Sequence, residues 1–120
     1  MVHLQPERLT VQVEDDYHIE LDPTWLRFLE HSCAPNVALD MPTGRVVALR
    51  AIAPGEVLAY FYPSTEWEMA APFVCRCGSP ECLGTIAGAS RLPLSALTGR
   101  WLAPHIARRL GLERRETAST

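Results

Sequence analysis

The sequence predicts a mainly β protein of many short strands and long loops, followed by a helical segment near the C-terminus. Three features lead to this prediction. Apolar and polar residues alternate between residues 9 and 21, which is typical of half-buried strands. Turn sequences containing proline or glycine then divide residues 37–72 into short pieces. From residue 92 onward the spacing of apolar residues becomes helical.

Length and composition are those of an ordinary globular protein. The 120 residues suit one domain, and apolar residues make up 48% and charged residues 21% of the chain. A formal net charge of -3 gives no basic footprint for nucleic acid. The chain shows no secretory signal and no apolar stretch near the length of about 20 residues that spans a bilayer. We therefore expect a cytoplasmic protein that binds neither nucleic acid nor membrane directly.

The first third of the chain predicts a β-hairpin and a short helix. The alternating segments 9–13 and 17–21 flank the acidic residues 14–16, as expected for two half-buried strands and their turn. Asp22 and Pro23 then offer a helix cap and a proline at the first helical position. We expect a short helix over residues 24–29.

The middle of the chain predicts a loop, two strands around a turn, and a buried strand. Serine, proline and asparagine within residues 31–36 favour a loop. Segments 37–39 and 45–51 flank a turn at residues 41–44, and Pro54-Gly55 suits a type II turn. Residues 56–62 are predicted to form a buried strand that ends at Pro63.

The last part of the chain predicts three helical segments. Thr65 and Glu68 have the spacing of a capping box, which favours a short helix up to about Ala71. Residues 92–102 carry apolar side chains at helical spacing, and a final helix is expected from Pro104 to Gly111. Residues 112–120 are expected to form a disordered tail.

The four cysteines predict a zinc site. Cys75, Cys77 and Cys82 lie close together on a glycine-containing segment, and thiolates are the ligands that structural zinc prefers. Two cysteines separated by one residue have poor geometry for a disulfide with each other. Cys33 is the fourth thiol, so a four-cysteine site would tie the middle of the chain to its last third. The alternative is a set of free or adventitiously paired thiols.

Three motifs in the chain together resemble those of a known family. The motifs are His-Ser-Cys-Ala-Pro-Asn at residues 31–36, Ala-Ile-Ala-Pro-Gly-Glu-Val-Leu-Ala-Tyr-Phe-Tyr at residues 51–62, and Cys-x-Cys-x4-Cys-Leu-Gly at residues 75–84. Their order and spacing resemble the C-terminal half of a SET domain with its post-SET zinc motif, over residues 17–88. The family comprises protein-lysine methyltransferases that use S-adenosylmethionine. The resemblance implies a SET-like β-clip fold with a pseudoknot loop, in a small SET protein of bacterial type.

The resemblance also implies roles for single residues. Tyr62 falls at the position of the family's catalytic tyrosine, and Tyr60 at its phenylalanine/tyrosine switch, which implies monomethylation. Glu30 and His31 fall at positions that bind the methyl donor. In the family the loop cysteine, here Cys33, commonly completes the zinc site with the three later cysteines. We expect Trp67 and Phe73 to be core residues rather than site residues.

Two departures from the family pattern stand out. Glu30 replaces the usual asparagine, which changes a neutral amide into a carboxylate that only accepts hydrogen bonds. The Gly-x-Gly motif that wraps the donor in the family does not precede Leu9. The chain is then a shortened relative, or its numbered start lies downstream of the true one, or a second subunit supplies the missing surface.

These features together define the expected organisation and function. We expect a SET-like domain over residues 1–74, a post-SET zinc loop over 75–91, a helical segment over 92–111 and a tail over 112–120. The expected function is an S-adenosylmethionine-dependent protein-lysine N-methyltransferase acting on a protein or peptide lysine; a homo-oligomer is left open. The alternatives are a catalytically inactive, zinc-stapled SET-like module that binds a protein partner, and an unrelated zinc-loop protein.

Overall fold

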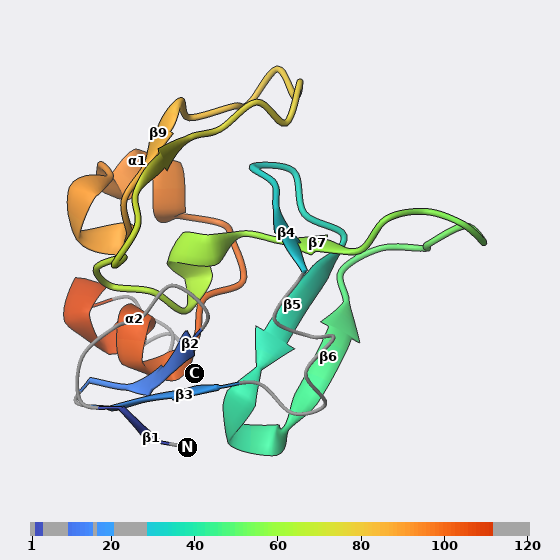
Figure 1. The fold of residues 1–120 in the computed structure, drawn as a ribbon. Helices are drawn as coiled ribbons and strands as arrows, with labels where there is room; N and C mark the ends of the chain where they lie inside the picture. Colours follow the sequence, from blue (N-terminus) through green and yellow to red (C-terminus); the bar gives the residue numbers. More distant parts are fainter. Residues whose placement is uncertain (1, 4–9, 16, 21–28, 112–120) are drawn as a thin grey trace.

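The structure is a computed structural model that describes residues 2–3, 10–15, 17–20 and 29–111. The β structure consists of small, separate sheets, and the C-terminal helices lie together on one side of the molecule (Figure 1). The strands are β1 (Val2–His3), β2 (Thr10–Glu14), β3 (Tyr17–Glu20), β4 (Glu30–His31), β5 (Val37–Asp40), β6 (Arg45–Ala48), β7 (Ala59–Tyr60), β8 (Phe73–Val74) and β9 (Thr85–Ile86). The mainly β class is therefore confirmed. Most of the helix expected over residues 24–29, and the tail over 112–120, lie outside the described residues.

The N-terminal sheet contains the predicted hairpin. Strands β2 and β3 pair in antiparallel orientation, with Val11 opposite Ile19, and β1 pairs with the other edge of β3. The register shifts between Gln12 and Glu14, so the pairing is irregular next to the turn. Val11 and Gln12 are both almost fully buried. Gln12 therefore carries a polar side chain into the interior at the start of this irregularity.

A second hairpin follows the predicted pattern of turns. Strands β5 and β6 are antiparallel and are joined by the 3-10 helix η2 (Met41–Thr43), after which Gly44 adopts a left-handed conformation with φ 67°. The first three residues of β5 are buried, whereas all four residues of β6 are exposed. The predicted turn at residues 53–56 is also present, because the Glu56 N–H donates to the Ala53 carbonyl at 3.1 Å. Gly55 has the positive φ, 83°, that a type II turn requires.

The long strand predicted over residues 56–62 is wrong in extent. Only Ala59 and Tyr60 form a strand, β7, which pairs in parallel with β4. The buried Asn36 side chain accepts the Ala59 N–H and donates to the Val57 carbonyl, both at 2.8 Å, so a side chain takes the place of a neighbouring strand. Tyr62 already belongs to the next element, the 3-10 helix η3 (Tyr62–Ser64), which contains Pro63.

The helix predicted from the capping box at Thr65 is wrong. Residues 65–71 form turns and bends, because their backbone groups find partners elsewhere. The Trp67 N–H donates to the Gln12 side chain at 2.8 Å, and the Met69 N–H donates to the Ala87 carbonyl at 3.0 Å. Tertiary hydrogen bonds have therefore replaced the helical ones that the local sequence favours.

The C-terminal segment contains one of the two predicted helices at the predicted length. Helix α2 (Pro104–Leu110) starts with proline and ends at Gly111, which has φ 76°. The helix predicted over residues 92–102 is wrong in extent, since α1 (Leu94–Leu97) makes a single turn after the 3-10 helix η4 (Ala89–Arg91). The Thr98 hydroxyl and backbone N–H both donate to the Leu94 carbonyl at 2.9 Å, and Thr98 then leaves the helical conformation. None of the helices within the described part of the chain is long and apolar enough to cross a membrane.

Three buried clusters hold these elements together. The first lies between β2, β5 and β7 and includes Leu39 and Tyr60; the second lies between η3 and the helices and includes Phe61 and Leu97. The third contains Cys33, Cys75 and Ile86. Tyr62 packs against both the first and the third cluster, so it stands at the junction between them.

Candidate functional site

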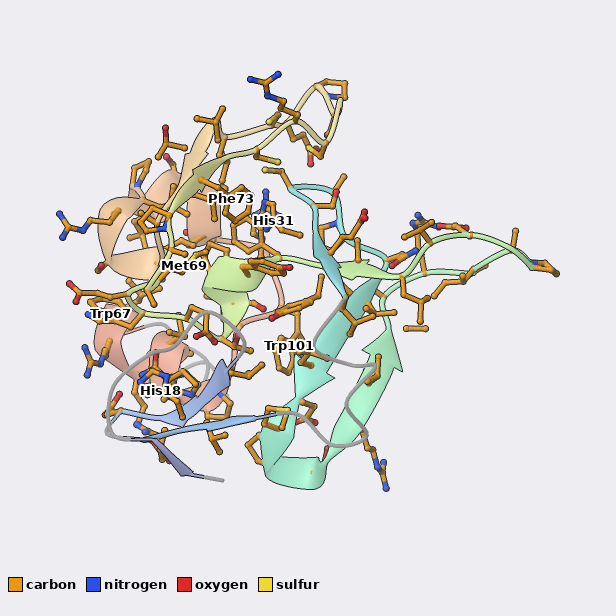
Figure 2. All side chains as sticks on the ribbon, in the orientation of Figure 1. His18, His31, Trp67, Met69, Phe73 and Trp101 are labelled. Carbon is orange, nitrogen blue, oxygen red and sulfur yellow. The ribbon has the colours of Figure 1, made fainter. Side chains whose placement is uncertain are left out.

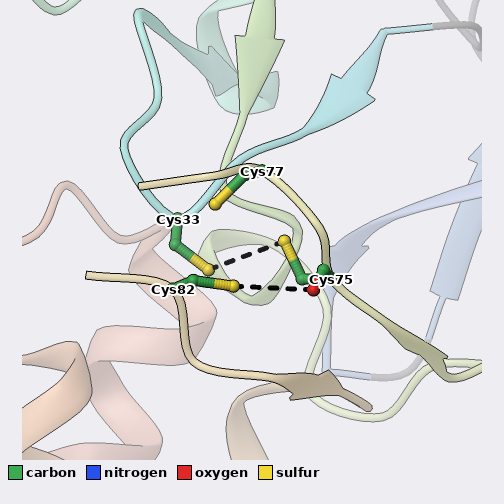
Figure 3. A group of neighbouring side chains, drawn as sticks. All are labelled: Cys33, Cys75, Cys77 and Cys82. Atoms are coloured by element: carbon green, nitrogen blue, oxygen red, sulfur yellow. Dashed lines mark hydrogen bonds between the residues drawn. The ribbon is translucent and has the colours of Figure 1, made fainter. Parts of the chain in front are cut away.

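Strands β8 and β9 form a short antiparallel pair that carries three of the cysteines. The Cys75 N–H donates to the Gly84 carbonyl at 2.8 Å, which continues the pairing beyond Val74 and Thr85. The segment turns between them, where the Cys82 N–H donates to the Ser79 carbonyl at 3.1 Å. Cys33 approaches from the loop after β4, so its sulfur meets the other three (Figure 3).

The geometry of the four sulfurs fits a tetrahedral zinc ion. All four Sγ atoms lie within 4.8 Å of one another, and the Sγ atoms of Cys33 and Cys75 are 3.9 Å apart. Zinc–sulfur bonds of about 2.3 Å place the sulfurs of a tetrahedral site about 3.8 Å apart. Four soft ligands at this spacing are the donor set of a structural zinc site. The predicted grouping of Cys33 with the three later cysteines is therefore confirmed, while the metal itself belongs to the proposal below.

Backbone N–H groups point at the sulfurs. The Leu83 N–H donates to the Cys33 sulfur at 3.3 Å. A hydrogen bond from the backbone N–H of Ser79 is the main cause that lowers the pKa of the Cys77 thiol to about 6, whereas burial raises the pKa of Cys75 to about 12. Such donors favour negative charge on sulfur, which a zinc ligand must carry.

The His31 side chain lies between the cysteine cluster and the tyrosines. Its Nδ1 accepts the backbone N–H of Tyr62 at 3.1 Å, and its Nε2 lies 3.5 Å from the Cys33 sulfur. The ring also packs edge-on against Phe73, with ring centroids 5.6 Å apart, and Figure 2 shows the two side chains next to each other. Burial is the main cause that lowers the pKa of His31 to about 4, with a smaller contribution from the charge of Arg100. The imidazole is therefore neutral at physiological pH.

The two tyrosines lie side by side. The rings of Tyr60 and Tyr62 have centroids 4.7 Å apart, although Tyr62 is in η3 rather than on the same strand as Tyr60. The Tyr62 hydroxyl donates to the Leu29 carbonyl at 2.7 Å, which places two oxygens together at the start of β4. Tyr60 is buried, and burial raises the pKa of its hydroxyl well above the usual value.

The backbone of β4 uses one edge for β7 and presents the other edge outward. The Ser32 N–H donates to the Tyr60 carbonyl at 3.1 Å, and His31 is the residue opposite Tyr60. In a parallel ladder, the partner residue forms its hydrogen bonds with the two neighbours of the residue opposite it. Tyr60 therefore bonds to the neighbours of His31, and the N–H and C=O of His31 itself point away from β7. The Glu30 side chain is exposed. Of the predicted site residues, Glu30 is the only one that is exposed.

Two further residues adjoin the site, and the sequence interpretation missed the second. Phe73 packs against a buried cluster, as expected of a core residue, and it also contacts both His31 and Tyr62. Arg100 donates to the Cys33 carbonyl at 2.8 Å and stacks over Phe61, 3.9 Å from the ring centroid. The position of Phe73 two residues before Cys75 could have indicated its place. No local signal indicates Arg100, because its partner is 67 residues away.

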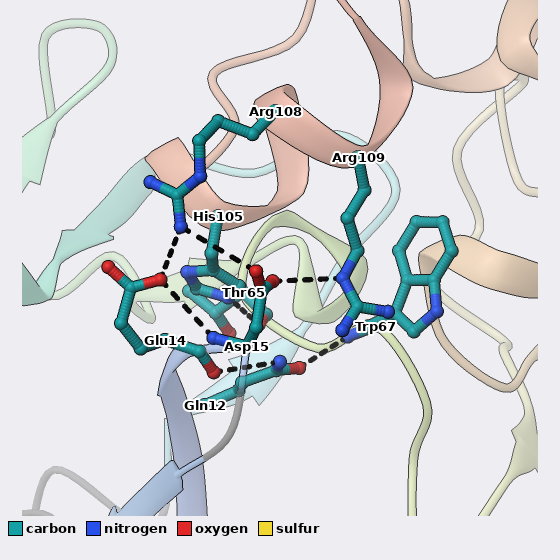
Figure 4. A network of polar contacts seen from close by, with 8 residues as sticks. All are labelled: Gln12, Glu14, Asp15, Thr65, Trp67, His105, Arg108 and Arg109. Atoms are coloured by element: carbon teal, nitrogen blue, oxygen red, sulfur yellow. Dashed lines mark hydrogen bonds and ion pairs between the residues drawn. The ribbon is translucent and has the colours of Figure 1, made fainter.

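A separate group of polar side chains joins the N-terminal hairpin to η3 and α2, and we call it the polar joint (Figure 4). Eight of its members are drawn in Figure 4, namely Gln12, Glu14, Asp15, Thr65, Trp67, His105, Arg108 and Arg109, and the ninth is Glu66. The Glu66 carboxylate is buried and accepts the Gln12 N–H at 2.8 Å and the Thr65 hydroxyl at 2.7 Å. Burial raises the pKa of Glu66 to about 7.

Comparison of the sequence with known proteins identifies a matching family and several relatives of this chain. Residues 7–63 match the SET domain family. The methyltransferase flvH of Aspergillus flavus is 44% identical over 99 residues, which cover 81% of this chain and 55% of that protein. Histone-lysine N-methyltransferase ash1 of Drosophila melanogaster is 34% identical over 100 residues, covering 77% of this chain and 4% of that protein.

A third relative has the same level of identity. The H3 lysine-36 specific histone-lysine N-methyltransferase of Mycosarcoma maydis is 34% identical over 82 residues, covering 63% of this chain and 8% of that protein. The chain thus spans about half the length of the flvH protein and less than a tenth of the two histone-lysine methyltransferases. These three relatives come from fungi and an insect, and the bacterial type expected for this chain stays a prediction.

Proposed function

Because this chain belongs to the SET-domain family, we propose that it is an S-adenosylmethionine-dependent protein-lysine N-methyltransferase. The observation that carries the proposal is the position of Tyr62. Its hydroxyl lies at the junction of β4, η3 and the cysteine cluster, 2.7 Å from a backbone carbonyl. The family places its catalytic tyrosine at this point of the sequence. Tyr62 is the residue that we propose to be catalytic.

The surroundings of Tyr62 suit the environment that methyl transfer needs. Bound S-adenosylmethionine would supply an electrophilic methyl group. Tyr62 Oη and the Leu29 carbonyl provide two oxygens that accept weak C–H hydrogen bonds from such a group. The rings of Tyr60 and Phe73 pack against the ring of Tyr62 and would limit the access of water to this part of the site.

We propose that the methyl donor binds along the outer edge of β4. The backbone N–H and C=O of His31 point to this edge and are suited to hydrogen-bond a heterocyclic base. Glu30 would contribute its exposed carboxylate to a hydroxyl or amino group of the donor. The imidazole of His31 faces inward, so it supports the site without reaching the donor.

We propose a structural role for zinc and a limit on the methylation state. Zinc held by the four thiolates would fix the post-SET loop, residues 75–91, against the loop that follows β4. Tyr60 fills the space beside Tyr62 with a buried ring and hydroxyl, which favours transfer of a single methyl group. The substrate would be a lysine of a protein, since two of the relatives are named histone-lysine methyltransferases.

Transfer of a tritiated methyl group tests this function. The zinc-loaded 120-residue chain would be incubated with tritiated S-adenosylmethionine and an array of lysine peptides that includes histone tails. We expect label on lysine, mainly as the monomethyl form. Tyr62→Phe should lower transfer at least about 100-fold while zinc content stays unchanged, because it removes only the hydroxyl. Thr98→Val, which removes an exposed hydroxyl, serves as the control, and undiminished transfer by Tyr62→Phe would contradict the assignment.

A second candidate is a catalytically inactive module that binds a protein partner. The observation that favours it is the apolar surface of the β5–β6 hairpin and the following loop. Val46 and Leu49 are each 41% exposed and Val57 is 65% exposed, which is high for such side chains. A folded, zinc-loaded chain that methylates no peptide on the array would support this candidate.

A further inference from the structure

We propose that His31 is a positioning residue that links the zinc site to the backbone of Tyr62. Its two ring nitrogens contact different residues. Nδ1 is 3.1 Å from the backbone nitrogen of Tyr62, and Nε2 is 3.5 Å from the Cys33 sulfur. One imidazole therefore connects a metal ligand with the tyrosine that carries the proposed chemistry. The catalytic importance of Tyr62 rests on the proposed function, but the bridge itself does not.

The contacts determine which nitrogen carries the proton. A backbone N–H can only donate, so the Nδ1 atom that faces the Tyr62 N–H must be the acceptor. In a neutral imidazole the other nitrogen, Nε2, then holds the hydrogen. The Nε2–H group faces the Cys33 sulfur. The ring therefore donates a hydrogen bond to sulfur and accepts one from the backbone N–H of Tyr62 at the same time.

The ring is held in this orientation from several directions. The rings of Phe61, Tyr62 and Phe73 contact the imidazole, with centroids 5.6, 5.2 and 5.6 Å away. The parallel pairing of His31 with Tyr60 also fixes the backbone on which the ring stands. Rotation of the imidazole would break both hydrogen bonds and disturb these contacts. The bridge is therefore rigid rather than one of several side-chain arrangements.

Metal binding is expected to strengthen the bridge. A zinc-bound sulfur carries negative charge and accepts an N–H more strongly than a neutral thiol does. The strengthened bond would hold the ring, and the ring in turn would hold the Tyr62 N–H. Because the imidazole is engaged in these inward contacts, the predicted binding of the methyl donor by His31 would use its backbone N–H and C=O.

Cadmium NMR of the full chain tests the bridge without any activity measurement. In the protein loaded with cadmium-113, we expect His31 to be protonated at Nε2 alone and its Hε2 proton to show scalar coupling to the metal through the Cys33 sulfur. We also expect the Tyr62 amide proton to exchange on the order of 10-fold faster in His31→Phe, which keeps a ring but loses both nitrogens. Phe73→Leu is the matched control, because it loosens the packing and leaves both hydrogen bonds in place.

The outcomes separate the bridge from the function. A proton on Nδ1 of His31 in the unmodified protein would overturn the bridge, even if His31→Phe failed to fold. Unchanged exchange of the Tyr62 amide in a folded, cadmium-loaded His31→Phe would also overturn it. Retained methyl transfer by Tyr62→Phe would instead contradict the proposed function and leave the bridge intact.

Discussion

The cysteine cluster and the polar joint connect distant parts of the chain in different ways. The cluster joins Cys33 to residues 75–82 through four sulfurs that meet at one point. The polar joint connects β2 to Thr65–Trp67 and to α2 through hydrogen bonds and ion pairs spread over nine residues. All ligands of a metal site act on one ion, so the loss of one ligand weakens the whole site, whereas a distributed network loses one contact at a time. The first should therefore fail as a unit and the second gradually.

The largest effect is expected from Cys33→Ser. The substitution leaves three thiolates and removes the only ligand that comes from the first half of the chain. Zinc affinity should fall by orders of magnitude, because structural zinc sites contribute roughly 10 kcal/mol or more of binding energy. Zinc per chain by atomic emission and amide exchange of β8 and β9 would measure the loss. Ala34→Ser is the control, and full zinc retention by Cys33→Ser would contradict the four-sulfur site.

Gln12→Ala should give a smaller loss, within the polar joint. The buried Gln12 side chain accepts the Trp67 N–H at 2.8 Å and donates to the Glu14 carbonyl at 2.9 Å. Its removal leaves two partly buried backbone groups without these bonds and should lower the free energy of unfolding by about 2–4 kcal/mol. Urea unfolding of the zinc-loaded protein would measure this. Thr43→Ala removes an exposed hydrogen bond and sets the baseline; an equal effect of the two substitutions would refute the role of Gln12.

Glu66→Gln should change how stability depends on pH rather than abolish folding. Burial raises the pKa of Glu66 to about 7 from its ordinary value of 4.5, so the folded state favours the protonated acid. The resulting stabilisation is fully present below pH 4.5 and is lost as pH rises through about 7. Between these limits the linked free energy is on the order of 3 kcal/mol at most.

Urea unfolding of both proteins at several pH values between 5 and 8 would test this expectation. Glutamine keeps the shape and an acceptor oxygen but does not titrate, so the decline in stability with rising pH should be weaker in Glu66→Gln. The difference between the two proteins isolates Glu66 from His105 and from the cysteines, which titrate in both. Identical slopes would show that Glu66 is not held protonated in the folded state.

The cysteine cluster could be predicted from the sequence, whereas the polar joint could not. Thiols have few uses in a chain of this kind, so the spacing of Cys75, Cys77 and Cys82 indicated a metal and left Cys33 as the fourth ligand. Glutamine and glutamate have many uses, and nothing near Gln12 indicates that its partner is Trp67. The same contact explains why the capping box at Thr65 does not start a helix.

Within the candidate site, too, the residues of a recognisable motif could be predicted, and those held by long-range hydrogen bonds could not. Tyr60, Tyr62 and His31 belong to a motif, and they do lie together in the structure. Asn36 shortens the predicted strand through side-chain bonds to residues more than twenty positions away, which no local pattern reveals. Arg100 supports the Cys33 loop in a similar way. Residues with a specific chemistry were predictable, and those that act through long-range hydrogen bonds were not.

Calorimetry with S-adenosylmethionine tests most directly whether the cysteine cluster orders a methyl-donor site. The donor would be titrated at up to millimolar concentration into the zinc-loaded chain and into the same chain stripped of metal by a chelator. The account predicts saturable binding by the zinc-loaded protein and loss of that binding after stripping. No binding by the folded, zinc-loaded chain, or equal binding by the two forms, would contradict it.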